Sequence, residues 1–303
     1  MDERAFDISI AFDEAEYLEP QLMLLFNNLK DKLPEDTIIH VVTSRNKNDK
    51  LRKYLKENFP VKIYYDSGKY TSHLKSRCRY MLNCFRIKTD KPWVMKIEAD
   101  LMFLKHLDSY KELMNPELDI IVEPENRKIH EDAIENRLWR MMYKNMNVKL
   151  PTEKMAFREN NEEGLPLIGT GLIIVKSKHL NTINKRWVDL TEKCEPWGNY
   201  NVHPNEQAFT GMVYDEDWNK KVYSAKYKLN PIGHYRKGDF PSAQLVENAI
   251  LPEDTICLDW HRWPWLEHMA KYNSNVKTII ESNKHVIPDS VWSTSTTINK
   301  TGF

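Results

Sequence analysis

The sequence has few cysteines, no net charge and no long apolar segment, and each absence narrows the class of protein. Its 303 residues include four cysteines, none in a C-x-x-C pair, which argues against a disulfide framework and indicates a reducing compartment. Basic and acidic residues both total 44, so the overall charge attracts neither nucleic acid nor an anionic membrane. No apolar run approaches the roughly 20 residues that cross a bilayer. We therefore expect no nucleic-acid partner and no transmembrane segment.

The sequence also lacks a signal peptide, internal repeats and a low-complexity linker. Residues 1–4 (MDER) are acidic and are not followed by the basic and hydrophobic regions of a secretory signal, so we expect a cytoplasmic protein. Hydrophobic residues make up 41% of the chain, which is enough for a full core. We expect a single domain over residues 1–303.

Strand-like and helix-like segments alternate in the first part of the chain. Alternating or β-branched runs predict strands, and apolar residues at three- and four-residue intervals predict helices. The predicted strands are 6–12, 37–43 and 61–65, and the predicted helices are 16–29, 51–59 and 72–87. This order predicts an α/β fold with a mainly parallel sheet flanked by helices, whose ligand crevice lies beyond the carboxyl ends of the strands.

Further elements are expected around a long polar loop in the second part of the chain. We predict strands at 118–122 and 167–175, helices at 131–146, at 178–194 and from residue 204, and a loop over 149–166. A long loop in a compact domain is often a binding loop or a lid.

Residues 96–103 (KIEADLMF) are interpreted as a buried strand that ends in two acids. Side chains two apart on a strand point to the same side, so Glu98 and Asp100 are expected roughly 7 Å apart, on the side of Lys96. Unpaired charge is costly between apolar flanks, so a divalent cation is expected there. The alternatives are that the acids cap a helix or pair with an arginine, or that Lys96 is the salt-bridge partner of Glu98.

Residues 93–107 resemble the DxD segment of GT-A-fold glycosyltransferases, which are nucleotide-sugar-dependent enzymes, with Glu98 in place of the first Asp. The resemblance implies a nucleotide-sugar-binding half over about 1–125 and, over 126–303, an acceptor-binding half with a C-terminal metal-ligand segment. It also implies that Asp100 contacts Mn²⁺ or Mg²⁺, while Glu98 reaches the donor ribose or a metal-bound water. A hard cation held by oxygen ligands stabilises the charge that develops on a nucleoside diphosphate leaving group.

The same resemblance extends to other positions around the expected donor site. It implies that Ala11 and Phe12 begin a loop that holds the nucleotide, and that Arg77 faces the donor diphosphate, although Arg77 also fits a solvated basic helix face. Gly171 follows in a segment that lies beside the sugars in the family, where glycine lets the backbone approach a ligand, but it also fits a tight turn.

Three later residues complete the candidate site that the resemblance implies. Residues 255–265 resemble a late strand that ends in a metal-binding histidine, so His261 is the expected third metal ligand and His234 is its rival. Glu206, at the start of the helix near Pro204, matches the acid that acts as catalytic base in inverting members. The alternatives are that Glu206 binds a sugar in a retaining enzyme, or stabilises a helix start capped by Asn205.

These expectations converge on a metal-dependent glycosyltransferase. It would transfer a hexose or pentose from a UDP- or GDP-sugar to an acceptor hydroxyl of a glycan or other glycoconjugate. One alternative is a non-catalytic nucleotide-sugar or carbohydrate binder with the same fold. Another is a sugar-1-phosphate nucleotidyltransferase, which ranks last because residues 12–16 lack the glycine-rich phosphate loop of that class.

Overall fold

The structure is a computed structural model of the whole chain. It describes residues 2–12, 18–43, 49–65, 83–128, 133–149, 152, 155–156, 163–164, 166–194, 204–215, 218–222, 253, 255–260 and 263–287.

Seven strands form the main sheet of the part that the structure describes, in the order β12-β6-β11-β4-β1-β2-β3. All neighbouring pairs are parallel except those that involve β11, which runs antiparallel to β4 and to β6. The predicted α/β class with a mainly parallel sheet is therefore confirmed. The strands are β1 (Phe6–Phe12), β2 (Ile39–Thr43), β3 (Val61–Tyr65), β4 (Trp93–Ile97), β6 (Ile120–Val122), β11 (Leu172–Lys176) and β12 (Lys220–Val222).

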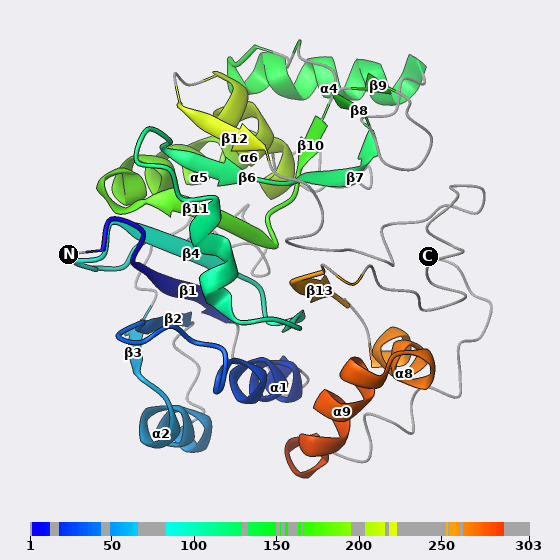
Figure 1. The fold of residues 1–303 in the computed structure, drawn as a ribbon. Helices are drawn as coiled ribbons and strands as arrows, with labels where there is room; N and C mark the ends of the chain where they lie inside the picture. The colour runs from blue at the N-terminus through cyan, green and yellow to red at the C-terminus, as the bar shows by residue number, and fades with distance from the viewer. Residues whose placement is uncertain are drawn as a thin grey trace.

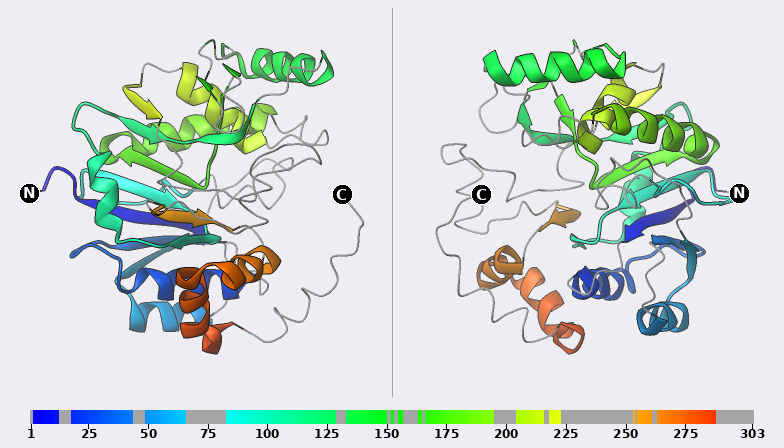
Figure 2. Two further views of the ribbon diagram at one scale, coloured as in Figure 1. Left: turned by 45° about the vertical axis from the view of Figure 1, so that its right-hand side comes forward. Right: turned by 180° about the vertical axis from the view of Figure 1, so that it is seen from behind.

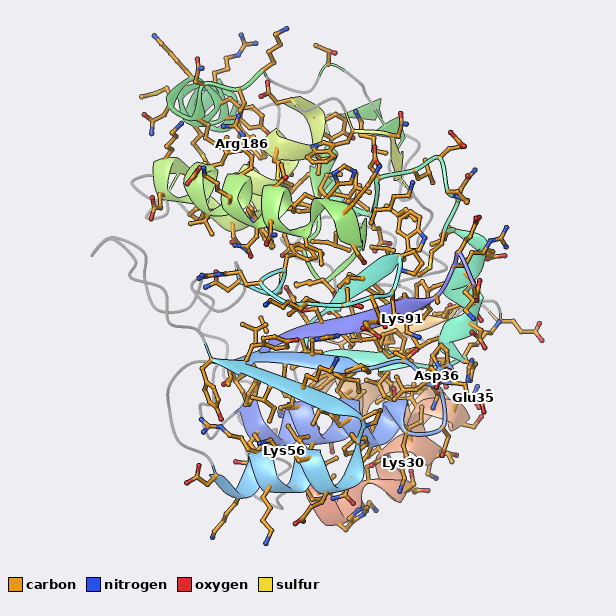
Figure 3. The ribbon with its side chains drawn as sticks, turned by 90° about the vertical axis from the view of Figure 1, so that its left-hand side faces the viewer. Lys30, Glu35, Asp36, Lys56, Lys91 and Arg186 are labelled. Atoms are coloured by element: carbon orange, nitrogen blue, oxygen red, sulfur yellow. The ribbon has the colours of Figure 1, made fainter. Side chains whose placement is uncertain are left out.

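Helices cover both faces of the sheet (Figures 1 and 2). On one face lie α1 (Glu19–Leu29) and α2 (Asp49–Asn58), and on the other α4 (Ala133–Met146), α5 (Leu180–Cys194) and α6 (Pro204–Asp215). Figure 3 shows the same layers with their side chains, with Arg186 of α5 on one side and Lys56 of α2 on the other.

Alternation along the strands divides the buried apolar residues into two cores. Phe6, Ile8 and Ile10 of β1 pack with Leu22 and Phe26 of α1. On the opposite face, Ala11 and Val94 pack with Met142, Trp187 and Phe209 from the other helices. The strands are apolar on both sides because both sides are covered, as is typical of parallel sheets.

The C-terminal part forms a third layer of packing beside α1. Leu24 of α1 joins a cluster with Trp260, Leu266 and Ile280, and α8, α9 and β13 lie together at one side of the sheet (Figure 1). Asn273 caps α9, because its side chain accepts hydrogen bonds from the backbone N–H groups of Asn275 and Val276, each at 3.1 Å. The elements are β13 (Cys257–Asp259), α8 (Trp263–Tyr272), α9 (Ser274–Ser282) and the 3₁₀ turn η5 (Lys284–Val286).

Shorter elements connect these layers, and two of them bear on the site. β5 (Leu101–Phe103) pairs antiparallel with β13, and β10 (Pro166–Ile168) leads into β11. The others are β7 (Pro124–Lys128), which pairs with β10, the pair β8 (Met155–Ala156) and β9 (Glu163–Gly164), and the 3₁₀ turns η2 (Leu107–Glu112) and η3 (Ser177–His179).

Four of the predicted elements need correction. The strand expected to carry both acids ends at Ile97, and a turn separates it from β5. The strand expected over 167–175 divides into β10 and β11, because residues 169–171 leave the ladder. The expected loop 149–166 contains β8 and β9, and the helix expected to continue to residue 87 is absent from 83–87. Among the described residues, no helix is long and apolar enough to cross a membrane.

Candidate active site at the carboxyl end of β4

The candidate site starts where the central strand β4 ends. Glu98 follows the last residue of β4, and Ala99 and Asp100 lie in the turn that leads to β5. The backbone N–H of Glu98 donates to the carbonyl oxygen of Gly171 at 3.0 Å. Glu98 and Gly171 are 73 positions apart in the sequence and were both expected at the site, and the structure places them in contact.

A buried lysine holds the carboxylate of Glu98. Lys96 has no exposed surface, and its Nζ lies 2.6 Å from Oε1 of Glu98 and also donates to the carbonyl oxygen of Thr170. The hydroxyl of Thr170 donates to the same Oε1 at 3.4 Å. The salt-bridge alternative that the sequence allowed for Lys96 and Glu98 is therefore confirmed, and the side chain of Glu98 keeps 24% of its surface exposed.

Asp100 lies against β13, the last strand of the part that the structure describes. The backbone N–H of Trp260, directly after β13, donates to the carbonyl oxygen of Asp100 at 3.1 Å. Just beyond Asp100, β5 is fixed to α1, because the side chain of Asn28 bonds both backbone groups of Phe103, at 2.7 Å and 3.0 Å. Asp100 itself is partly exposed. The chain is thus held at Asp100 by Trp260 and at Phe103 by Asn28, on either side of the start of β5.

The ion pair of Lys96 and Glu98 lies close to the buried thiol of Cys84. Burial raises the pKa of Cys84 to about 12, and the charges of Lys96 and Glu98 act on that pKa in opposite directions. The carbonyl oxygen of Cys84 accepts a hydrogen bond from the hydroxyl of Ser9, which pairs with Lys96 across β1 and β4. Lys96, Glu98 and Cys84 therefore lie on one face of the sheet near the strand end.

Ala11 and Phe12 lie at the carboxyl end of β1, next to β4, the strand that the two acids follow. Their side chains are buried in opposite cores. Only their backbone groups are therefore suited to a ligand, which fits a loop that holds a nucleotide through its main chain.

Glu206 lies in the first turn of α6, as expected. The helix begins at Pro204, so Asn205 lies inside the first turn, which corrects the alternative in which Asn205 precedes and caps it. The hydroxyl of Thr210 accepts from the backbone N–H of Ile168 at 2.9 Å and donates to the carbonyl oxygen of Glu206 at 2.8 Å. This links Glu206 to β10, the strand that leads into Thr170 and Gly171.

The other predicted site residues, Arg77, His261 and His234, lie outside the described residues. Within the described ranges, no group of three or more His, Cys, Asp or Glu side chains is arranged to hold a metal ion.

The sequence did not point to two contacts of the site. Thr170 contacts Lys96 through its carbonyl oxygen and Glu98 through its hydroxyl, and its position between two glycines was the available signal. The contact of Trp260 with Asp100 is a backbone hydrogen bond between distant segments, for which the sequence carries no signal.

Comparison with solved structures decides the fold family. A galactosyltransferase, LgtC, in complex with donor and acceptor sugar analogues superposes with a TM-score of 0.59, over 95% of this chain and 99% of that chain, at 12% identity. Mouse xyloside xylosyltransferase 1 superposes with a TM-score of 0.54, over 84% and 97%, also at 12% identity. The chain has the GT-A fold of glycosyltransferases. The GT-A glycosyltransferase GlyE of Streptococcus pneumoniae adds a TM-score of 0.51, over 94% of this chain and 66% of that chain, at 15% identity.

No protein-family model matches the sequence, and no curated protein sequence matches it. The GT-A likeness is therefore one of fold, at an identity too low to transfer a substrate.

Proposed function

We propose that this GT-A protein is a metal-dependent glycosyltransferase that moves a hexose or pentose from a nucleotide diphosphate sugar to an acceptor hydroxyl. The observation that carries the proposal is the position of Glu98 and Asp100 directly after the central parallel strand β4. Ligands of open α/β sheets bind beyond the carboxyl ends of their strands. Two acids at that edge, in a fold shared with LgtC, support a donor site there.

The carboxylates of Glu98 and Asp100 fit a hard divalent cation, Mn²⁺ or Mg²⁺, because carboxylate oxygens are its preferred ligands. Asp100 is the proposed main ligand, since the residue is partly exposed and its carbonyl oxygen is held by the backbone N–H of Trp260. When bound, the cation would offset the charge of the departing diphosphate. His261 follows Trp260, the residue that contacts Asp100, and this supports His261 over His234 as the third ligand.

The other described residues receive roles that fit where they lie. Glu98 is proposed to contact the donor ribose or a metal-bound water, and the backbone of Ala11 and Phe12 to hold the nucleotide. Gly171, in contact with Glu98, would let the backbone approach the sugars. Arg77 is retained as the proposed partner of the diphosphate.

Glu206 is the proposed base, which would accept the proton of the acceptor hydroxyl if the reaction inverts configuration. Its helix is tied to β10, beside the glycine-flanked turn that touches Glu98, so the acceptor would be held between α6 and that turn. If the configuration is retained, Glu206 would bind a sugar hydroxyl.

The test is the Asp100→Ala variant with a panel of UDP- and GDP-sugars, with and without Mn²⁺, read as release of nucleoside diphosphate. Loss of one electrostatic contact to the transition state typically costs about 3 kcal/mol, so turnover should fall by roughly 100-fold or more. The control is Asp108→Ala, which removes an exposed acid that pairs with Lys111. It should leave turnover unchanged.

Equal turnover by Asp100→Ala and wild type would contradict the proposed site. Binding of a nucleotide sugar by the wild type, without turnover on any acceptor, would instead favour the non-catalytic binder.

A further inference from the structure

Lys96 is a fully buried cation placed directly beside the candidate metal site. Its ammonium contacts a carboxylate oxygen of Glu98 at 2.6 Å and the carbonyl oxygen of Thr170. A buried lysine needs such partners, because an unpaired charge in the interior is costly. Both contacts lie near the carboxyl end of β4, which Glu98 and Asp100 follow in the sequence.

The ammonium changes the charge that the acid pair presents to a cation. Glu98 and Asp100 alone would offer two negative charges, but Lys96 offsets that of Glu98 at hydrogen-bond distance. The hydroxyl of Thr170 donates to the same oxygen, Oε1, so both neighbours restrict that side of the carboxylate. Lys96, Glu98 and Asp100 together therefore carry one net negative charge, where the two acids alone would carry two.

We propose that Lys96 is a positioning residue that weakens binding of the bare cation and couples it to the nucleotide. This rests on the proposed function, because it concerns the metal that the function requires. With Glu98 neutralised, the negative charge that the cation still lacks would come from the diphosphate of the donor. The cation and the nucleotide would then bind together, with Glu98 acting as the charge partner of Lys96 instead of a direct ligand.

Removing the charge of Lys96 and removing that of Glu98 should therefore shift the Mn²⁺ affinity in opposite directions. Lys96→Met leaves the charge of Glu98 uncompensated, so bare Mn²⁺ should bind about tenfold more tightly, since a unit charge a few ångströms away in a partly buried site has an effect of this order. Glu98→Gln leaves the ammonium uncompensated and should weaken binding about tenfold by the same estimate. The double variant should return to within about threefold of the wild type.

The experiment is a titration of the full chain with Mn²⁺, followed by electron paramagnetic resonance of the free ion, without and with UDP. The matched control is Lys176→Met, which removes a lysine from β11 at the opposite end of the sheet, beside the first residue of β4. It should leave the Mn²⁺ affinity unchanged. In Lys96→Met, UDP should improve Mn²⁺ binding less than it does in the wild type.

A lysine with a purely structural role would give a different result. Folded Lys96→Met would then bind Mn²⁺ as the wild type does or more weakly, and this outcome would overturn the proposal. If Lys96→Met does not fold, the comparison of Glu98→Gln with the double variant decides, because equal weakening in both would identify Glu98 as a direct ligand and contradict the inference.

Different binding results would show that the proposed function itself is wrong. A wild type that binds no Mn²⁺ even with UDP present, or an Asp100→Ala variant that binds it like the wild type, would remove the metal site itself and both proposals with it. Loss of binding in Asp100→Ala together with an unchanged Lys96→Met would overturn only the role of Lys96.

Discussion

A second buried charge network, away from the candidate site, shows what single residues contribute to this fold. Asp7 of β1 is 1% exposed, and its Oδ2 lies 2.9 Å from Nε2 of His40 on β2 and accepts from the hydroxyl of Thr89 at 2.6 Å. Its Oδ1 accepts from the backbone N–H of Ile38 at 2.9 Å. Burial alone would raise the pKa of Asp7, but these hydrogen bonds lower it below its ordinary value of 3.8.

The lowered pKa of Asp7 predicts how stability depends on pH. A carboxyl whose pKa is depressed on folding stabilises the fold above its unfolded pKa, and the contribution is lost as the pH falls through the folded pKa. Asp7→Asn should lower the free energy of unfolding by about 2 kcal/mol at neutral pH, and this difference should shrink below about pH 4. Urea unfolding across pH 3 to 7 measures it. Asp90→Asn, at an exposed acid near Thr89, is the control, and a difference independent of pH would contradict the assignment.

Residue-scale contacts were predictable from the sequence only where the partners are close along the chain. Lys96 and Glu98 are two residues apart, and their pairing was among the sequence alternatives. Asp7 and His40 are 33 residues apart, and only the parallel register of β1 and β2 brings them together. Nothing in the local pattern of either residue indicates the other.

At the scale of elements, the position of α6 decides where Glu206 lies. The indole N–H of Trp187 on α5 donates to the carbonyl oxygen of Asn205 at 2.8 Å, and the hydroxyl of Thr210 accepts from the backbone N–H of Ile168. Two polar contacts thus fix the helix to its neighbours, in addition to the apolar packing of Phe209.

Removing the hydroxyl of Thr210 should loosen α6 from β10. Thr210→Val keeps the side-chain shape but leaves the buried N–H of Ile168 without its acceptor, which costs about 1–3 kcal/mol. In the control, Thr191→Val, the lost hydroxyl only donates to the carbonyl oxygen of Trp187 within α5, so the loss should stay under about 1 kcal/mol. Urea unfolding followed by circular dichroism compares the two. Equal losses would mean that the bond to Ile168 does not hold the helix.

The elements themselves were predictable where their periodicity is local. The expected bounds of β1 and β3 match the structure, and those of β2 and α2 differ by two residues at the start and by at most one at the end. The antiparallel direction of β11 was not predictable, because an apolar run between two covered faces looks the same in either direction. The turn at Ala99 and Asp100 was missed for a similar reason, since the apolar residues on both sides of the acids continue the strand pattern.

At the scale of the whole molecule, one sheet joins two cores. β1 contributes Ile8 and Ile10 to one core and Ala11 to the other, so neither face can lose its packing without exposing the same strand. We therefore expect the two faces to unfold together.

Three buried thiols, distributed over both cores, can be used to follow the unfolding of each core. Cys257 lies in the core of α1, and Cys84 and Cys194 lie in the opposite core. Burial raises the pKa of Cys84 and of Cys194 to about 12, so little reactive thiolate is present at pH 8. All three thiols should resist N-ethylmaleimide in the native protein and become labelled at the same urea midpoint, as read by peptide mass spectrometry. Labelling of Cys257 at a clearly lower urea concentration would show that the faces unfold separately.

The fold of the whole molecule was predictable, but the complete site was not. Alternation of strands and helices indicated the α/β class, and residues 93–107 indicated the GT-A resemblance that the solved structures confirm at 12% identity. The metal-ligand set stays a prediction, because the third ligand depends on how a distant C-terminal segment returns to β4. The structure shows that return as far as Trp260.

The most direct test of the account is a crystal of the protein soaked with Mn²⁺ and UDP, with anomalous diffraction measured at the manganese edge. The account predicts an anomalous peak at the carboxyl end of β4, with a carboxylate oxygen of Asp100 bound directly to the ion and the ammonium of Lys96 still on Glu98. A peak elsewhere, or nucleotide bound at this edge without manganese at Asp100, would contradict it.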